Sequence, residues 1–391
     1  MAKIVNSWNE WDPLKYVVLG DPTGSALTAP GPDWQYNAAS GGMPLGYYGK
    51  FPQDMVDAAK EQQEGFKKIM EKRGIKVDRV TVPEAIKQQR PVVTPEWTQI
   101  NLHNVNNPRD AFLPVGNEIM EAACSRRSRH YEHLALRPLF EQWFKEDPEF
   151  IWTAAPKPRL TDASYVDGYY YDFAFNWDEA QRKEKMLKGE YHLTEAEPMW
   201  DAADATRLGK DIIWPLSCVS NHAGVDWITR YLARRGLRVH PVQFDSTRAN
   251  YWRPWHIDVV VIPVRPGLIM FCPDKEPITP GFADWFKRND WEVVMAVRPS
   301  FDWKEDLTMS APYHGKGLRG PNWIGMNTLS LSPREICVFD KETAYQEQLD
   351  KLGFEVIPVA YDKVYKFGGM LHCNTLDIYR EGDCVDYFPN Q

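Results

Sequence analysis

One arrangement recurs five times along this chain of 391 residues: a short apolar strand or strand pair, an amphipathic helix and a closing strand. Apolar residues at helical spacing predict the helices, and short apolar or alternating runs predict the strands. The predicted helices cover residues 55–74, 130–145, 223–235, 282–288 and 345–352, and the closing strands begin at residues 75, 149, 237, 291 and 353. A unit of this kind cannot bury its sheet face alone, so the units must pack on one another.

Strands that alternate with helices predict an α/β fold. Five similar units fit a closed radial arrangement, and they fit equally an ordinary open α/β sheet whose units are alike by chance. With 43% hydrophobic residues the chain can bury a large core, and no domain boundary is evident, so we predict a single domain over residues 1–391. The insert at residues 156–199 is expected to be a surface excursion or a lid over a site.

Composition excludes several classes of function. The formal net charge of −8 and the lack of a long basic run argue against nucleic acid and anionic membranes as partners. The start of the chain has no apolar signal segment, and the longest apolar run, Val259–Ile262, is too short to cross a bilayer. Six cysteines without a CxxC pair are typical of reduced thiols in a cytoplasmic enzyme, with no zinc-site spacing. We therefore expect a soluble, cytoplasmic protein without metal or cofactor; a homodimer is compatible with the sequence.

A candidate nucleophile lies in the stretch from Phe367 to Asp377. The glycines Gly368 and Gly369 let the backbone adopt unusual angles and approach a ligand, and they precede Cys373, which is followed by a short predicted strand. A structural reading is also available, because free cysteine is among the most buried residue types.

Four further polar residues lie where predicted units begin: Asp110, Asp204, His256 and Asp258. In a radial fold such starts converge. His256 and Asp258 are two positions apart, so on an extended segment both side chains would point to one face. Each residue taken singly also has a structural reading.

The structural readings are a helix cap for Asp204, an ion pair with Arg109 for Asp110, and a satisfied core position for His256. Three aspartates and a histidine at such positions, together with a cysteine, nevertheless favour a catalytic role for the set over separate structural roles.

The combined set suits a guanidinium substrate. Its carbon is a poor electrophile, so an enzyme must hold the cation in place and attack it with a thiolate, here from Cys373. Two carboxylates can bind the planar N–H groups in a bidentate manner, for which we assign Asp110 and Asp258. We assign His256 as the acid and base, and Asp204 as the carboxylate that fixes its tautomer. This chemistry needs no metal or cofactor.

The motifs closely resemble those of the arginine:glycine amidinotransferase family, of the pentein superfamily. The matching segments are Gly116-Asn-Glu-Ile119, Trp152–Pro158, Asp201-Ala-Ala-Asp204 with Arg207, Trp255-His-Ile-Asp258, Pro273-Asp-Lys275, Trp323–Asn327 and Phe367–Cys373. The resemblance implies a five-bladed pseudosymmetric α/β-propeller built of ββαβ-type units. It also implies a ping-pong reaction in which L-arginine amidinates Cys373, ornithine leaves, and the amidino group passes to an amine acceptor. The roles of His256, Asp204, Asp110 and Asp258 are those assigned above.

Departures from the family pattern concern the substrate pocket. Arg253 and Trp255 replace an Asn and a Met of members that act on glycine, Lys275 replaces an arginine that meets the carboxylate of the donor, and Gly325 replaces a serine. We therefore expect an acceptor other than glycine. The opening and closing segments look most like amidinotransferases of cyanobacterial guanidine-toxin pathways, of the saxitoxin and cylindrospermopsin types.

Other functions stay open at this point. A glycine or lysine amidinotransferase has the same chemistry with a different acceptor. A hydrolase of the same fold, as in arginine deiminases, would pass the amidino group to water and yield citrulline. A non-catalytic guanidine-binding protein would leave Cys373 unmodified by arginine.

Overall fold

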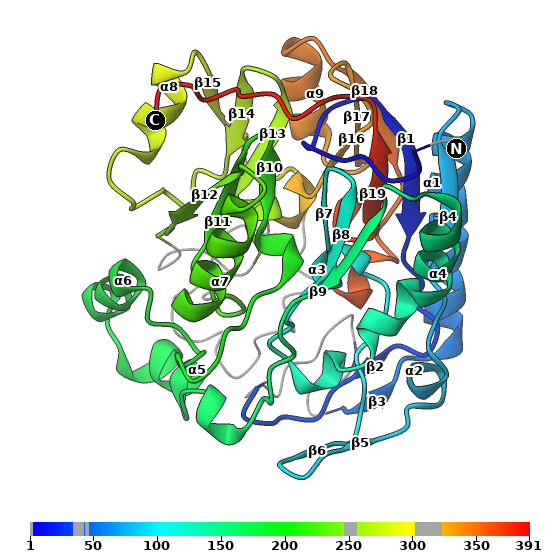
Figure 1. The fold of residues 1–391 in the computed structure, drawn as a ribbon, viewed down its shortest axis with the longest axis vertical. Helices are drawn as coiled ribbons and strands as arrows, with labels where there is room; N and C mark the ends of the chain where they lie inside the picture. The colour runs from blue at the N-terminus through cyan, green and yellow to red at the C-terminus, as the bar shows by residue number, and fades with distance from the viewer. Residues whose placement is uncertain (1–2, 34–42, 44–46, 246–255, 302–322) are drawn as a thin grey trace.

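Five three-stranded sheets with one internal order dominate the computed structural model, which describes residues 3–33, 43, 47–245, 256–301 and 323–391 (Figure 1). We number the sheets 1 to 5. Their strands are, in order, β19 (Thr375–Arg380), β1 (Leu14–Leu19) and β4 (Lys76–Arg79); β7 (Phe112–Val115), β8 (Glu118–Glu121) and β9 (Ile151–Ala154); β10 (Thr206–Leu208), β11 (Asp211–Pro215) and β12 (Arg238–Val242); β13 (Val261–Arg265), β14 (Leu268–Phe271) and β15 (Glu292–Met295); β16 (Leu329–Ser330), β17 (Glu335–Phe339) and β18 (Glu355–Val359). In each sheet the middle strand runs antiparallel to the first strand and parallel to the third.

A helix connects the middle strand of each sheet to its parallel neighbour, as a parallel pair requires. These helices are α1 (Gln53–Glu71), α4 (Arg137–Glu146), α7 (His222–Ala233), α8 (Phe282–Arg288) and α9 (Thr343–Lys351). In α1 the buried side chains recur every three or four residues, which places them on one face. Gly74, at φ +76°, follows α1 in the left-handed region that glycine adopts without strain. The predicted α/β class is confirmed.

The second predicted helix is shorter than expected. Residues Glu132–Leu136 form a 3₁₀ turn, and the α-helix begins only at Arg137. Pro138 accounts for the boundary, because proline has no N–H to donate to a preceding turn but fits the first turn of a helix.

Shorter elements fill the connections: α2 (Glu84–Gln88), α3 (Pro108–Ala111), α5 (Tyr169–Tyr171), α6 (Glu179–Lys188), and the strand pairs β2 (Ala26–Leu27) with β3 (Gly49–Lys50) and β5 (Val92–Val93) with β6 (Thr98–Gln99). The insert at residues 156–199 contains α5 and α6. Its residues Tyr169 and Tyr170 are buried in the core shared by sheets 2 and 3, so part of the insert packs against the body of the protein.

Sheet 1 is built from segments far apart in the sequence. Its strand β19 pairs with β1 in antiparallel fashion, with Asp377 opposite Val17 (Figure 1). The sequence pattern gave the first unit only a strand, a helix and a strand, and the missing antiparallel partner comes from the segment after Cys373.

The hydrophobic cores connect sheets that follow one another along the chain. One cluster joins sheets 1 and 2, a second joins sheets 2 and 3, a third joins sheets 3, 4 and 5, and a fourth joins sheets 5 and 1. Representative members are Val18 with Phe112, Met120 with Trp214, Ile213 with Met270 and Ile336, and Cys337 with Leu19. Within the described ranges the five sheets remain separate and form no closed sheet. Over the same ranges, no helix has the length and apolar character needed to cross a bilayer.

Candidate active site

Cys373 lies on a tight turn that depends on both preceding glycines. Gly368 ends a 3₁₀ turn, Tyr365–Phe367, at φ +108°, a conformation that side chains disfavour. A Cβ atom on Gly369 would lie 2.4 Å from the Cβ of Cys373, so only glycine leaves room for the cysteine. The turn leads directly into β19, and Cys373 is buried.

Two side chains contact the Cys373 thiol. Its Sγ donates to Asp258 Oδ2 at 3.1 Å and accepts from Asn327 Nδ2 at 3.2 Å. Asn327 follows a 3₁₀ turn, Trp323–Met326, and its Oδ1 also accepts the backbone N–H groups of His372 and Cys373 at 3.0 Å each. Burial raises the pKa of the Cys373 thiol well above its usual range, and the charges of Asp258 and Asp110 raise it further. In this environment the free protein carries a thiol.

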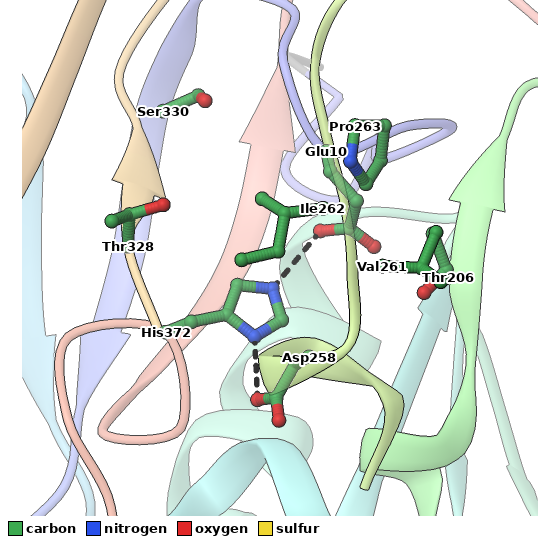
Figure 2. A pocket seen from close by; sticks show the side chains of 9 residues that line it. All are labelled: Glu10, Thr206, Asp258, Val261, Ile262, Pro263, Thr328, Ser330 and His372. Atoms are coloured by element: carbon green, nitrogen blue, oxygen red, sulfur yellow. Dashed lines mark hydrogen bonds and ion pairs between the residues drawn. The ribbon is translucent and has the colours of Figure 1, made fainter. Parts of the chain in front are cut away.

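Asp258 lies between the thiol and a second histidine. His372 Nδ1 is 2.9 Å from Asp258 Oδ2, and His372 Nε2 is 3.3 Å from Glu10 Oε2 (Figure 2). Burial opposes ionisation of Asp258, but the hydrogen bond from His372 and the charges of His372 and His256 outweigh it and lower its pKa to about 2.

The prediction that residues 256–258 are extended is wrong. Ile257–Val259 form a 3₁₀ turn closed by the Val260 N–H to the Ile257 carbonyl at 2.8 Å, and β13 begins only at Val261. A turn of three residues has no periodicity that a sequence pattern can reveal.

His256 is surrounded by carboxylates. Its Nε2 lies 3.3 Å from Asp201 Oδ2 and its Nδ1 lies 3.6 Å from Asp110 Oδ1. Burial lowers the pKa of His256, but the carboxylates Asp110, Asp201 and Asp204 raise it to about 9. The ring is therefore an imidazolium at neutral pH.

Asp110 is buried beside Arg129. Its Oδ2 accepts from Arg129 Nη1 at 2.9 Å, while its buried Oδ1 takes no hydrogen bond from the described residues. Burial raises the pKa of Asp110, although His256 and Arg129 partly oppose this. The alternative ion pair with Arg109 is not formed, because Arg109 Nη2 binds Asp377 instead.

Asp204 was predicted to contact the His256 ring directly, but it hydrogen-bonds to two serines instead. Its Oδ2 accepts from Ser217 at 2.7 Å and from Ser220 at 2.6 Å, and burial raises its pKa to about 7. The carboxylate recorded at hydrogen-bond distance from His256 is that of Asp201. Both belong to the motif Asp201-Ala-Ala-Asp204, and Asp204 still acts on His256 through its charge.

Two of the four residues predicted to shape the substrate pocket lie within the described part of the chain. Arg253 and Trp255 lie outside the described residues. Lys275 is buried close enough to Asp258 to feel its charge, and burial lowers its pKa. Gly325 packs against Glu342: a Cβ there would lie 2.6 Å from Glu342 Cγ, so the space for a side chain at position 325 is occupied by Glu342.

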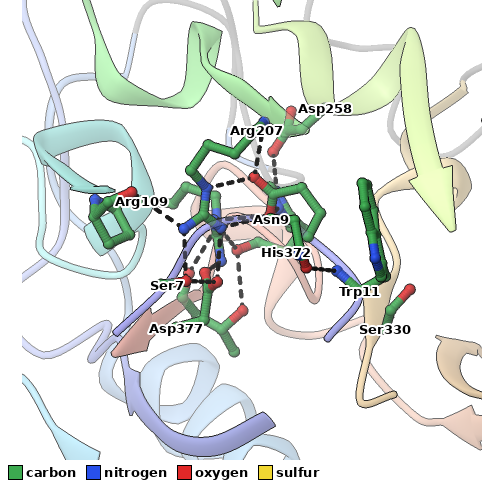
Figure 3. A network of polar contacts seen from close by, with 12 residues as sticks. Ser7, Asn9, Trp11, Arg109, Arg207, Asp258, Ser330, His372 and Asp377 are labelled. Carbon is green, nitrogen blue, oxygen red and sulfur yellow. Dashed lines mark hydrogen bonds and ion pairs between the residues drawn. The ribbon is translucent and has the colours of Figure 1, made fainter. Parts of the chain in front are cut away.

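A network of buried charged side chains also supports the turn that carries Cys373 (Figure 3). Arg207 Nε and Nη2 bind the two oxygens of Glu10 at 2.7 Å each, and Nη2 also binds Asp377 at 2.6 Å. Arg109 Nε donates to the carbonyls of His372 and Thr375 at 3.0 Å each. Arg109, which forms an ion pair with Asp377, thus holds the backbone on both sides of Cys373 by hydrogen bonds.

Sequence reasoning missed several residues of this site: Glu10, Arg129, Asp201, Asn327 and His372. Asp201, Asn327 and His372 stood inside motifs already singled out, whereas nothing near Glu10 or Arg129 connects them to the cysteine. In the described part of the chain, no group of three or more His, Cys, Asp or Glu side chains is arranged to hold a metal ion.

Comparison with known proteins found relatives along the whole chain. An L-arginine:L-lysine amidinotransferase of Pseudomonas savastanoi pv. phaseolicola is 31% identical over 98% of this chain and 96% of its own length. A mitochondrial glycine amidinotransferase of Xenopus laevis is 33% identical over 98% of this chain and 85% of its own. A solved structure of an amidinotransferase from the saxitoxin biosynthetic pathway of Microseira wollei has a TM-score of 0.78 and 32% identity, covering 98% of this chain and 99% of that one. No family model matches the chain.

Proposed function

Because this chain belongs to the amidinotransferase family, we propose that it takes the amidino group of L-arginine onto Cys373, releases ornithine, and passes the group to an amine acceptor. The single observation that carries the residue assignment is the buried thiol of Cys373, which donates to Asp258 and lies among the carboxylates and histidines described above.

Two carboxylate oxygens fit the guanidinium of the donor. The buried Asp110 Oδ1 takes no hydrogen bond from the described residues, and the contacts of the buried Asp258 carboxylate with His372 and Cys373 both fall on its Oδ2. A bound guanidinium would donate to Asp110 Oδ1 and Asp258 Oδ1 and add a positive charge beside Cys373. That charge would counteract the burial and the carboxylates that hold the thiol protonated, so substrate binding would favour the thiolate.

Because His256 is already an imidazolium in the free protein, the proton of the Cys373 thiol leaves to solvent when the substrate binds, and from there on the protons balance through His256. The thiolate forms a C–S bond to the guanidinium carbon, and the His256 imidazolium protonates the nitrogen of the departing ornithine as the C–N bond breaks. The neutral imidazole then accepts a proton from the acceptor amine, which attacks the S-amidino adduct and frees the thiolate. We assign Asp201 the position that orients the ring, with Asp204 acting through its charge.

We further propose an acceptor larger than glycine, in the biosynthesis of a guanidine natural product of the saxitoxin type. The similarity to the saxitoxin-pathway enzyme supports this, whereas the lysine and glycine enzymes at similar identity keep those acceptors as alternatives. Steady-state assays with arginine and each candidate amine test it; turnover with glycine far above all others would exclude the proposal.

The five sheets are proposed to be blades around one axis, within a single domain over residues 1–391. Supporting this, each sheet shares a core with the next and sheet 5 shares one with sheet 1, so the order of contacts is cyclic. A cytoplasmic location stays a prediction.

The decisive experiment for the chemistry is mass spectrometry of the intact, then digested, protein after incubation with arginine alone. We expect an amidino adduct on the Cys373 peptide and release of ornithine, with the other cysteines as internal controls. In Cys373→Ala the adduct and turnover are lost while the fold is retained. Accumulation of citrulline would instead identify a hydrolase, and an unmodified Cys373 without product would exclude arginine as the donor.

A further inference from the structure

We propose that His372 is a positioning residue: held between Asp258 and Glu10, its ring keeps the Asp258 carboxylate charged and oriented toward Cys373. The inference rests on the proposed function, because it concerns the carboxylate assigned to the guanidinium. The sequence motifs assigned no role to His372 or to Glu10, the residue that anchors its ring.

Both ring nitrogens of His372 face carboxylate oxygens. Nδ1 lies 2.9 Å from Asp258 Oδ2 and Nε2 lies 3.3 Å from Glu10 Oε2, with the ring between the two carboxylates (Figure 2). An ionised carboxylate only accepts hydrogen bonds, so each contact requires a proton on the nitrogen. A ring that donates from both nitrogens carries a positive charge, which favours the ionised form of its partners.

Glu10 is a fixed anchor for this ring. Arg207 binds both of its oxygens, and Arg109 Nη1 lies 3.5 Å from Oε2. Arg207 is itself held by Asp377 and by the Ser7 hydroxyl, at 2.6 and 2.7 Å. Glu10 is therefore held in charge and position by arginines, and the pKa of its carboxyl lies well below the usual range despite burial.

The consequence falls on Asp258. One oxygen, Oδ2, takes both the His372 ring and the Cys373 thiol, so Oδ1 is left for a ligand. Without the ring, only the charge of His256 and the hydrogen bond from the Cys373 thiol would oppose the effect of burial on Asp258. The carboxyl would then take up a proton at higher pH and could rotate away from the thiol.

A small cavity beside the ring makes its removal testable. The cavity has a volume of about 20 Å³, which is room for about one water molecule, and Thr206, Thr328 and Ser330 line it together with Glu10, Asp258 and His372 (Figure 2). Val261, Ile262 and Pro263 complete the lining, so removing the imidazole enlarges a cavity that has an apolar side and a polar side, and water that enters it can bind to the polar side.

Other charged groups act on this pair and stay in place in the variants below. They are Arg207, Arg109 and Asp377 around Glu10, and His256, Lys275 and Cys373 around Asp258. A shift in the pH profile that appears when only His372 or Glu10 is altered can therefore be assigned to the His372 ring.

The experiment measures the rate of Cys373 amidination by arginine as a function of pH. In His372→Ala we expect the acid limb set by Asp258, whose pKa is about 2 in the wild-type protein, to move upward by about 1 to 3 pH units, so that the rate at about pH 4 falls by up to roughly tenfold. His372→Asn, which keeps one donor but no charge, and Glu10→Gln should shift it in the same direction by less. Ser7→Ala weakens the same arginine network without contacting His372, so it should lower the Tm and leave the limb unchanged.

A second readout does not depend on arginine. The ¹⁵N spectrum of the histidine rings, with His372 assigned by its loss in His372→Asn, should show both His372 nitrogens protonated in the wild-type protein. A neutral ring, or an unchanged acid limb in folded His372→Ala, would overturn the inference. If His372→Ala does not fold, unchanged limbs in His372→Asn and Glu10→Gln would do so. A wild-type protein that forms no adduct would refute the proposed function, while the ring spectrum still decides the state of His372.

Discussion

Asn327 holds Cys373 from both ends of its side-chain amide: Oδ1 accepts the Cys373 N–H at 3.0 Å, and Nδ2 lies 3.2 Å from Sγ. Because Oδ1 also accepts the N–H of His372, one amide fixes the backbone of the turn and the direction of the thiol together.

Removing this amide should affect both stability and chemistry. Asn327→Ala leaves the buried N–H of Cys373 without this acceptor and the N–H of His372 with only the Asn327 carbonyl at 3.4 Å, so we expect the free energy of unfolding to fall by about 1–3 kcal/mol. The thiolate loses a donor, and amidination should slow by about tenfold or more. Asn327→Asp keeps an acceptor but no donor, so it should retain more stability and remain slow. Rapid amidination in Asn327→Asp would show that the donor to sulfur is unimportant. Denaturant titration and mass spectrometry measure the two effects.

Gly369→Ala should abolish adduct formation, because its Cβ would lie 2.4 Å from the Cβ of Cys373 and 2.8 Å from Asn107 Oδ1. Gly65 in α1 is the matched control: no atom lies within 4 Å of a Cβ there, and alanine is the better helix former by about 1 kcal/mol. Gly65→Ala should therefore react normally with equal or higher Tm. Normal amidination in Gly369→Ala would mean that the turn tolerates displacement.

The pKa of His256, raised to about 9 from its ordinary value of 6.5, predicts a pH dependence. Its charge interactions with the carboxylates stabilise the folded protein fully below pH 6.5, and this contribution is lost as pH rises through about 9. Amidination should decline over the same rise, since the acid that protonates the departing nitrogen disappears. Unfolding free energies and single-turnover rates across pH test this. His256→Gln should lose the alkaline decline in stability, and a decline that persisted in that variant would belong to another group.

Gly325→Ser should destabilise the protein by about 1–3 kcal/mol through crowding. The Glu342 side chain that it would displace is held by the Ser300 N–H at 2.8 Å. Calorimetry would measure the loss of Tm, and Glu342→Ala in the same chain should relieve the clash. If Gly325→Ser instead kept its Tm and changed the preferred amine, the added hydroxyl would have to reach the acceptor.

Local patterns predicted the repeating units well. The helix predicted at residues 282–288 is α8 with the same bounds, because apolar residues at helical spacing are a local signal. The candidate site was predictable to the extent that glycines, cysteine and carboxylates occur in distinctive motifs. The family assignment is likewise confirmed by relatives that match the full chain.

Long-range partners could not be predicted in this way. Nothing in the sequence near Asp110 indicates Arg129 rather than the adjacent Arg109 as its partner, because the choice depends on how two turns meet. Asp201 and Asp204 differ only in which side of a 3₁₀ turn they occupy, and the sequence does not specify that side.

Because of sheet 1, the surroundings of Cys373 depend on contacts between segments far apart in the sequence, which form slowly. Segments 374 residues apart, at Asn6 and Arg380, must meet before β19 can settle beside β1, and contacts of such high order delay folding. Cys373 lies immediately before that strand, so the thiol acquires its neighbours only when the chain has closed on itself. A nascent or partly folded chain carries an ordinary cysteine, and reactivity is a late product of folding.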